Sequence, residues 1–372
     1  MTMTPSERDT AAPAAKGGRQ GKLHSGGNTM LRRTVLAAVA LPLAALVAVP
    51  DAAAQRTRLT VYSAFENEQL PVFKQAAEAA VPGIEIVWVR DSTGVITTRL
   101  LAERENPRAD VIWGLSVFSL QRLELDNMLL PYTPAGAEKL RPQFRSDRDP
   151  MTWVGLDAFV SAVCFNTLVA RQRNLPTPRT WQDLLNPAFR GLIAMPNPAS
   201  SGTGLLTVAG WLGTMGEEQA WAFMTRLHDN IAVYTHSGSA PCNNAARGEY
   251  AIGVSFDMRA VALKNQGAPI EIIVPTDGVG FDLEGAAILR GTRNEAAAKR
   301  LMDFAVSEAA MALYGRYYAL LGLPGVTPTV QGYPPEFAER LAKVDFAAVA
   351  ANRDRILAEW SRRFDAKSAP RN

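Results

Sequence analysis

The sequence predicts an α/β protein built on a largely parallel sheet. In the first third of the chain, β-like segments alternate three times with helix-like segments, and the connecting loops are short. That order is typical of parallel strands joined by crossover helices. We expect strands at residues 58–63, 83–90 and 109–114, and helices at residues 66–81, 91–106 and 116–126.

Hydrophobic spacing supports these elements. Apolar residues recur every three or four positions from Leu70 to Ala80, as in a helix with one buried face, and they alternate from Ile84 to Trp88, as in a strand. Ligands of such sheets bind beyond the carboxyl ends of the strands. Those ends are residues 64–66, 91–94 and 114–116.

The rest of the chain repeats this style after a long β-rich segment at residues 153–166, which is expected to cross into a second lobe. Further strands are predicted at residues 192–195, 231–235, 251–256, 270–274 and 285–289, the last of them back in the first lobe. Helices are predicted at residues 180–186, 205–215, 217–229, 259–267, 294–317 and 345–365.

Residues 1–54 are expected to be a leader that ends in a signal peptide. A basic start at residues 30–33 precedes an apolar run at residues 35–50, and small residues follow at 52–54. This is the pattern of a cleavable secretory signal. We expect cleavage after Ala54, Sec export to the periplasm, and Met30 as a better start codon than the first residue.

The charge of the chain excludes several partners. The whole sequence has 39 basic and 36 acidic residues, but the leader holds six of the former and three of the latter, so 33 of each remain. A neutral mature chain gives no reason to expect nucleic acid or an anionic membrane surface as a partner. Two lobes or domains suit a chain of 372 residues.

Two cysteines occur in the mature part, Cys164 and Cys242. In an exported protein such a pair predicts a disulfide, and two buried free thiols are the alternative. A metal site at this pair is not expected, because neither cysteine has a second metal ligand near it in the sequence.

The most informative motif lies at residues 195–204, MPNPASSGTG, between a short apolar strand and an apolar helix. A helix start leaves several N–H groups without intrahelical partners and carries partial positive charge. Small residues let a ligand approach this backbone, and serine and threonine hydroxyls add donors. The motif therefore predicts a seat for a phosphate-like or carboxylate group. Ordinary helix capping is the alternative.

Five segments in one order carry a family resemblance. The segments are residues 59–62 (LTVY), 91–94 (DSTG), 109–114 (ADVIWG), 197–204 (NPASSGTG) and 234–239 (YTHSGS). With these segments the chain resembles periplasmic solute-binding proteins, and among them the subfamily assigned to 2-aminoethylphosphonate uptake, relatives of the ferric-ion-binding and thiamine-binding proteins.

The resemblance implies a two-lobed α/β clamshell of the type II-like periplasmic binding protein class, with hinge strands. It implies a monomer that binds its small solute without a cofactor and without catalysis, and delivers it to the membrane permease of an ABC transporter. The expected organisation is a first lobe at residues 55–155, a second lobe at 156–279, a return to the first lobe at 280–330, and a C-terminal helical segment at 331–372.

Two helix starts from different lobes are expected to hold the phosphonate. They contribute Ser92, Thr93 and Gly94 from one lobe, and Ser200, Ser201, Gly202 and Thr203 from the other. Tyr234 and the turn at residues 235–239 lie at another strand end. His236 in that turn is either a further donor or a histidine bonded to backbone.

The ammonium of the solute requires a carboxylate or an aromatic face. Glu66 and Asp257 follow strand ends in the two lobes and are the candidates, with helix capping as the alternative role. Trp113 and Phe65 are either pocket walls or core residues. Asp282 and Glu284 flank the expected return to the first lobe and rank lower.

Two rival functions are weaker on the residues. A ferric-ion site would use paired tyrosines, and Tyr317 with Tyr318 is such a pair, but an apolar helix around them favours a core role. A secreted hydrolase would need nucleophile or zinc motifs, and the chain has neither Gly-x-Ser-x-Gly nor His-Glu-x-x-His.

Overall fold

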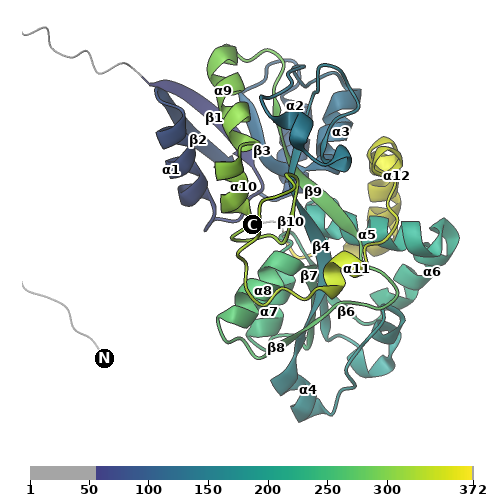
Figure 1. Cartoon of the computed structure of the whole chain (residues 1–372). Helices are drawn as coiled ribbons and strands as arrows, with labels where there is room; N and C mark the ends of the chain where they lie inside the picture. The colour runs from purple at the N-terminus through teal and green to yellow at the C-terminus, as the bar shows by residue number, and fades with distance from the viewer. Residues whose placement is uncertain (1–55, 371–372) are drawn as a thin grey trace, which may run out of the picture. The chain divides into compact units, whose positions relative to one another are not determined.

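One long strand organises the fold. In this computed structural model, which describes residues 56–370, β4 (Val154–Asn166) runs through the middle of a ten-stranded sheet. Its first half pairs with β9 (Phe281–Ile288) up to Val160, and its second half pairs with β7 (Ile252–Phe256) and β8 (Ile270–Ile273) from Ser161 onward. The change of partner divides the sheet into two halves, which we call the first and second lobes (Figure 1).

The first lobe contains the three predicted strand–helix repeats. Its strands lie in the order β2-β1-β3-β9, and β1 pairs in parallel with both neighbours. Its elements are β1 (Thr57–Ser63), α1 (Leu70–Ala80), β2 (Ile84–Arg90), α2 (Thr93–Ala102), β3 (Val111–Ser116), α3 (Val117–Leu125), β9, α9 (Glu295–Ala305), α10 (Glu308–Tyr314) and β10 (Leu320–Leu321).

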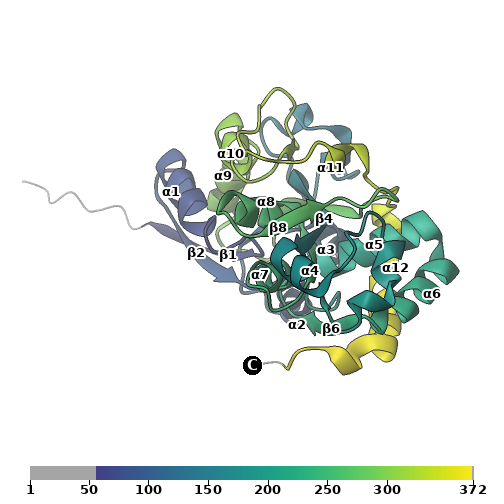
Figure 2. The same cartoon turned by 90° about the horizontal axis from the view of Figure 1, so that it is seen from below.

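The second lobe has the strand order β7-β5-β6, with parallel pairing of β5 to both neighbours. Its elements are α4 (Thr167–Arg173), β5 (Ile193–Pro196), α5 (Gly202–Met215), α6 (Glu217–His228), β6 (Ile231–Thr235), α7 (Ala240–Ala246), β7, α8 (Asp257–Asn265) and β8. The view from below places α5 and α6 at the opposite side of the unit from α1 (Figure 2).

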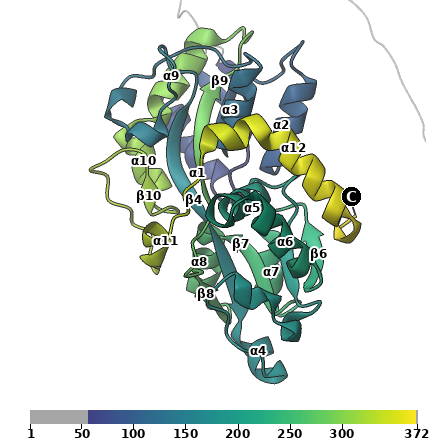
Figure 3. The same ribbon diagram turned by 90° about the vertical axis from the view of Figure 1, so that its right-hand side faces the viewer.

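The C-terminal segment joins the lobes a second time. After the short α11 (Glu336–Glu339), helix α12 (Phe346–Phe364) packs on α3 of the first lobe, and its end reaches α6 and β6 of the second (Figure 3). Trp360 on this helix meets the ring of Tyr234 at 4.7 Å between centroids. Asp345 caps the helix through the N–H of Ala348, as its position before an apolar periodic run predicts.

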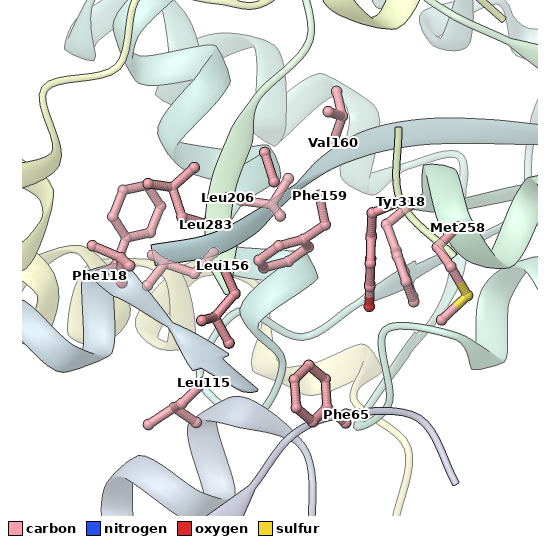
Figure 4. Packing of buried hydrophobic residues seen from close by; sticks show 14 of the residues in the cluster. Phe65, Leu115, Phe118, Leu156, Phe159, Val160, Leu206, Met258, Leu283 and Tyr318 are labelled. Atoms are coloured by element: carbon pink, nitrogen blue, oxygen red, sulfur yellow. The ribbon is translucent and has the colours of Figure 1, made fainter. Parts of the chain in front are cut away.

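Each lobe has its own aromatic core. In the first lobe Phe65, Phe73 and Trp113 pack together with Tyr314, and the indole of Trp113 donates to the Tyr314 hydroxyl at 2.8 Å. In the second lobe Trp211 packs between Trp181 and Phe223. Buried apolar residues at the lobe boundary, among them Leu156, Phe159 and Leu283, join the two cores into one hydrophobic cluster (Figure 4).

A disulfide links Cys164 in β4 to Cys242 in α7, with the two Cα atoms 5.4 Å apart. This is the pair expected from the sequence, and the alternative of two free thiols is wrong. On the chain-entropy model, closing a loop of 78 residues stabilises the fold by about 4.5 kcal/mol.

Four predicted elements need correction. The helix expected from residue 66 begins at Leu70, because residues 66–69 form a turn. The helix expected at residues 180–186 is a single 3-10 turn, Gln182–Leu185, which suits its short length. The helix expected at residues 294–317 breaks at Ser307, whose hydroxyl accepts from the Ala310 N–H. The strand expected at residues 285–289 is the end of the longer β9.

The expected leader, signal peptide and cleavage site lie outside the described residues. Among residues 56–370, no helix combines the length and the apolarity that crossing a membrane requires. The lobe boundaries expected near residues 155 and 279 stay predictions.

Candidate functional site

Two helix starts from different lobes meet face to face. Helix α2 begins at Thr93, and helix α5 begins at Gly202 after the N-cap residue Ser201. The Gly94 N–H donates to the Ser200 carbonyl at 2.9 Å, which joins the lobes through their backbones. A Cβ added at Gly202 would lie 2.7 Å from the Thr93 hydroxyl oxygen. Only glycine permits so close an approach.

A small cavity lies where these helix starts meet. Its volume is about 40 Å³, enough for a few water molecules, so a solute can enter only when the lobes part. The cavity is lined by residues of both lobes: Ala64, Glu66, Arg90, Ser92, Thr93, Phe159, Ser201, Gly202, Thr203, Ser237, Gly238, Phe256, Glu284 and Tyr318.

Most residues predicted for the negative end of a solute reach this cavity. Ser92, Thr93, Ser201, Gly202 and Thr203 line it. The Ser92 side chain occupies the N-cap position of α2 without making a capping hydrogen bond. The Ser201 hydroxyl caps α5 through a long contact of 3.4 Å from the Gly204 N–H. Capping therefore accounts for Ser201 in part and leaves the Ser92 hydroxyl available.

Ser200 lies beside the cavity rather than on its wall. Its hydroxyl contacts Nδ1 of His236 at 3.1 Å, and Nε2 of the same ring lies 2.8 Å from the Ala369 carbonyl oxygen. His236 is thus held between the loop before α5 and the C-terminal segment. Asn197 ties the same two segments through its side-chain amide, 2.9 Å from the Ser368 hydroxyl.

Tyr234 and Asp257 lie away from the cavity, in contrast to their predicted roles. The Tyr234 hydroxyl and Nδ1 of His228 are 3.0 Å apart, and burial raises the pKa of that phenol. Asp257 is fully buried and accepts from the N–H groups of Val160, at 3.1 Å, and Met258, at 2.9 Å. Asp257 follows the end of β7, and Tyr234 lies one residue before the end of β6, but local hydrogen bonds occupy both side chains.

Glu66 lines the cavity, and cations of both lobes hold its carboxylate. Arg259 of α8 donates to Oε2 at 2.9 Å, and Nη2 of Arg90 lies 3.6 Å from Oε1. The Ser239 hydroxyl of the second lobe donates to Oε1 as well. Glu66 is therefore the centre of a contact between the lobes, and its charge is already compensated.

Four more carboxyl groups are buried near the lobe boundary: Asp157 on β4, Asp282 and Glu284 on β9, and Asp257 at the start of α8. Glu284 lies directly opposite Asp157 in the β4–β9 register, and the Asp282 carboxyl accepts from the Ser116 hydroxyl. Burial raises the pKa of Glu284 and of Asp282 to about 8 and that of Asp257 to about 6. Burial and the neighbouring Glu284 charge raise the pKa of Asp157 well above its usual range.

Several wall residues escaped the sequence-based prediction. Arg90 is the last residue of β2, so the rule that ligands bind beyond strand ends would have found it. Phe159, Phe256 and Tyr318 come from strands and a loop that meet only in the folded chain. Phe159 and Tyr318 lie near each other beside the lobe boundary (Figure 4).

Other candidates are core residues. Trp113 and Phe65 pack in the first lobe and do not line the cavity. The expected tyrosine pair is split, because Tyr317 packs edge-on against Phe73, whereas Tyr318 reaches the cavity and accepts from the Gln69 amide at 3.3 Å. Within residues 56–370, no cluster of three His, Cys, Asp or Glu side chains could hold a metal ion.

Two α/β lobes that close over a polar cavity define a solute-binding protein of the clamshell class. Residues 106–343 match the profile of the bacterial extracellular solute-binding protein family. The chain belongs to this family. It is therefore a binding protein and not an enzyme.

Curated relatives agree with this family. A Haemophilus influenzae protein without an assigned function is 31% identical over 72% of this chain and 78% of its own length. A probable ABC transporter periplasmic-binding protein, y4fP of Sinorhizobium fredii, is 26% identical over 85% of this chain and 89% of its own. A putative 2-aminoethylphosphonate-binding periplasmic protein of Salmonella typhi is 26% identical over 40% of this chain and 41% of its own.

Solved structures share the fold. The periplasmic binding protein AfuA from Actinobacillus pleuropneumoniae, solved with fructose-6-phosphate, has a TM-score of 0.76 and 27% identity, covering 83% of this chain and 99% of AfuA. Iron-bound HitA from Pseudomonas aeruginosa has a TM-score of 0.68 over 81% of this chain and 99% of its own. Its 18% identity supports the shared fold alone.

Proposed function

We propose that this protein is the periplasmic component of an ABC importer and binds a small solute with a phosphonate or phosphate group, in the first place 2-aminoethylphosphonate. The meeting of the α2 and α5 helix starts in one cavity is the observation that supports this proposal. Such helix starts offer N–H donors and partial positive charge to an anion.

The donors of this site suit a reversible carrier. Thr93 and Thr203 line the cavity with hydroxyl-bearing side chains, and the first turns of both helices have N–H groups without intrahelical partners, of which the Gly94 N–H is bonded to Ser200. Arg90 adds one cation at the wall, but its guanidinium also donates to the Phe65 carbonyl at 2.8 Å. Largely neutral donors bind an anion when the lobes close and release it when they open.

Two ligand choices have support. The carboxylate of Glu284 at the cavity suits a solute with an ammonium group, and a partial relative carries the 2-aminoethylphosphonate name. A sugar phosphate is the second candidate, because AfuA was solved with fructose-6-phosphate and is similar over most of this chain. Both candidates place a phosphorus-bearing group at the same helix starts.

Calorimetry on ligand-free protein distinguishes these choices. The mature chain is unfolded and refolded to remove bound solute, then titrated with 2-aminoethylphosphonate, fructose 6-phosphate, inorganic phosphate, ferric citrate and thiamine. We expect binding of 2-aminoethylphosphonate, and recovery of the unaltered compound after prolonged incubation. Heat with ferric citrate or thiamine, and none with any phosphorus compound, would contradict the proposal.

A further inference from the structure

Glu284 is a carboxylate at the cavity wall with a spare oxygen. It lies in β9, only 8% of its surface is exposed, and it lines the cavity between the lobes. Its Oε2 atom has no hydrogen-bond partner within the described part of the chain. That atom is sealed within the protein, so a donor behind it would satisfy it and leave the other carboxylate oxygen for a solute.

Asp157 holds Glu284 from behind. The two residues are direct partners in the antiparallel β4–β9 register, so their side chains leave the sheet on the same face. Asp157 is fully buried, and neither of its carboxyl oxygens has a partner among residues 56–370. Two adjacent buried carboxyl groups do not both ionise, so this pair retains a proton, and a protonated Asp157 can donate to Glu284.

The other acids near the cavity lack this freedom. Both oxygens of Glu66 are bound, one by Arg259 and the other by Ser239. Asp257 accepts from two backbone N–H groups and from the Tyr333 hydroxyl, and it does not line the cavity. Glu284 is thus the acid at this site with an acceptor to spare.

We propose that Glu284 determines specificity by accepting a hydrogen bond from an ammonium or hydroxyl group of the solute, at the end remote from phosphorus, and that Asp157 positions it. The inference rests on the proposed function and adds which solutes are selected. The rings of Phe159, Phe256 and Tyr318 line the same cavity, and aromatic rings favour a cation at their faces.

A comparison of two ligands on matched variants tests the inference. Wild type, Glu284→Gln and Glu66→Gln are titrated with 2-aminoethylphosphonate and with ethylphosphonate, which lacks the nitrogen. We expect wild type to prefer the amino compound and Glu284→Gln to reduce that preference at least tenfold. Glu66→Gln is the matched control. It should weaken both ligands alike, because it breaks a contact that closes the lobes.

Further variants keep the test decisive. Glu284→Asp retains the charge but withdraws it from the solute, so it should also reduce the preference. Asp157→Asn retains a donor to Glu284 and should keep the preference. An unchanged preference in folded Glu284→Gln or Glu284→Asp overturns the inference, and so does an equal loss for both ligands.

The outcome for wild type separates this inference from the proposed function. Wild type that binds no phosphorus compound overturns both. If fructose 6-phosphate is the solute bound, the preference is measured as the ratio of the affinities for fructose 6-phosphate and inorganic phosphate. The group that donates to Glu284 is then a sugar hydroxyl. If Glu284→Gln keeps the wild-type preference for the sugar phosphate, the role of Glu284 is overturned and the proposed function is not.

Discussion

The N–H of Gly94 donates to the carbonyl of Ser200 at 2.9 Å, so the first turn of α2 in one lobe is bonded to the loop before α5 in the other. The two backbones approach so closely that a Cβ at Gly94 would lie 2.2 Å from the Ala199 carbonyl oxygen. The contact can form only in a closed clamshell. Gly94 therefore lies in the contact between the lobes, and the direct ligand contact expected for it stays a prediction.

Gly94→Ala should impair closure without unfolding either lobe. The added methyl group meets backbone, which cannot move aside as a flexible side chain would. We expect affinity for 2-aminoethylphosphonate to fall at least tenfold, and the radius of gyration with ligand to stay at its ligand-free value in solution scattering. Val95→Ala is the matched control, because Val95 is the next residue of α2 and is exposed. Normal affinity and normal compaction in Gly94→Ala would show that the contact is incidental.

Thr93→Val should lower the affinity for a solute that carries a phosphonate or phosphate group. The substitution keeps the shape of the side chain and removes the hydroxyl that lines the cavity. Loss of one hydrogen bond to a charged group costs about 1.5–3 kcal/mol, or a tenfold to hundredfold loss of affinity by calorimetry. Thr98→Val on the same helix is the control, since the Thr98 hydroxyl donates to the Gly94 carbonyl and does not line the cavity. Equal affinities of the two variants for the solute would show that the Thr93 hydroxyl makes no hydrogen bond to it.

Binding of an amine should release a proton near neutral pH. Burial raises the pKa of Glu284 to about 8, and a bound ammonium favours the charged carboxylate and so lowers that pKa. Affinity for 2-aminoethylphosphonate should therefore rise as pH increases toward 8. The titratable and charged groups around Glu284 are Glu66, Asp157, Asp257, Asp282 and the Tyr318 hydroxyl, with Arg90 and Arg259 paired to Glu66.

Calorimetry in PIPES and in Tris measures the released proton, because these buffers differ in their heat of protonation. Glu284→Gln with the same ligand is the control, since it subtracts the proton changes of the phosphonate itself. An equal proton count in wild type and in Glu284→Gln would exclude Glu284 from the titration.

Much of the fold follows from the sequence because its signals are local. The periodicity from Leu70 to Ala80 and the alternation from Ile84 to Trp88 each lie within one element, and both elements are present. Errors arise where a local signal is ambiguous. The run at residues 294–317 has helical periodicity throughout, and only the cap formed by Ser307 reveals that it is two helices.

The site was less predictable because its parts are distant in sequence. Helix starts such as Thr93 and Gly202 can be read from local motifs, and both line the cavity. The pairing of Glu284 with Asp157 depends on the β4–β9 register across more than a hundred residues. The compensation of Glu66 by Arg259 depends on closure of the lobes. No pattern within one segment indicates either.

Buried acids at the lobe boundary should make the protein less stable as pH rises. The pKa values of Asp282 and Glu284 are raised to about 8 in the folded chain, against about 4 in an unfolded one. Below pH 4 both states are protonated, and the stability associated with these groups is complete. Between pH 4 and 8 the unfolded state has lost protons that the folded state retains, so the free energy of unfolding falls with pH.

The slope should be about 1.4 kcal/mol per pH unit for each fully retained proton, measured by urea unfolding between pH 6.5 and 8. His228, whose pKa is lowered from 6.5 by burial, contributes with the opposite sign, and this contribution fades as the pH rises through the window. Asp282→Asn should flatten the slope, because it removes one of the two groups and keeps an acceptor for the Ser116 hydroxyl. A free energy of unfolding that stays constant or rises from pH 6.5 to 8 in wild type would mean that these carboxyl groups ionise in the folded chain at ordinary pH.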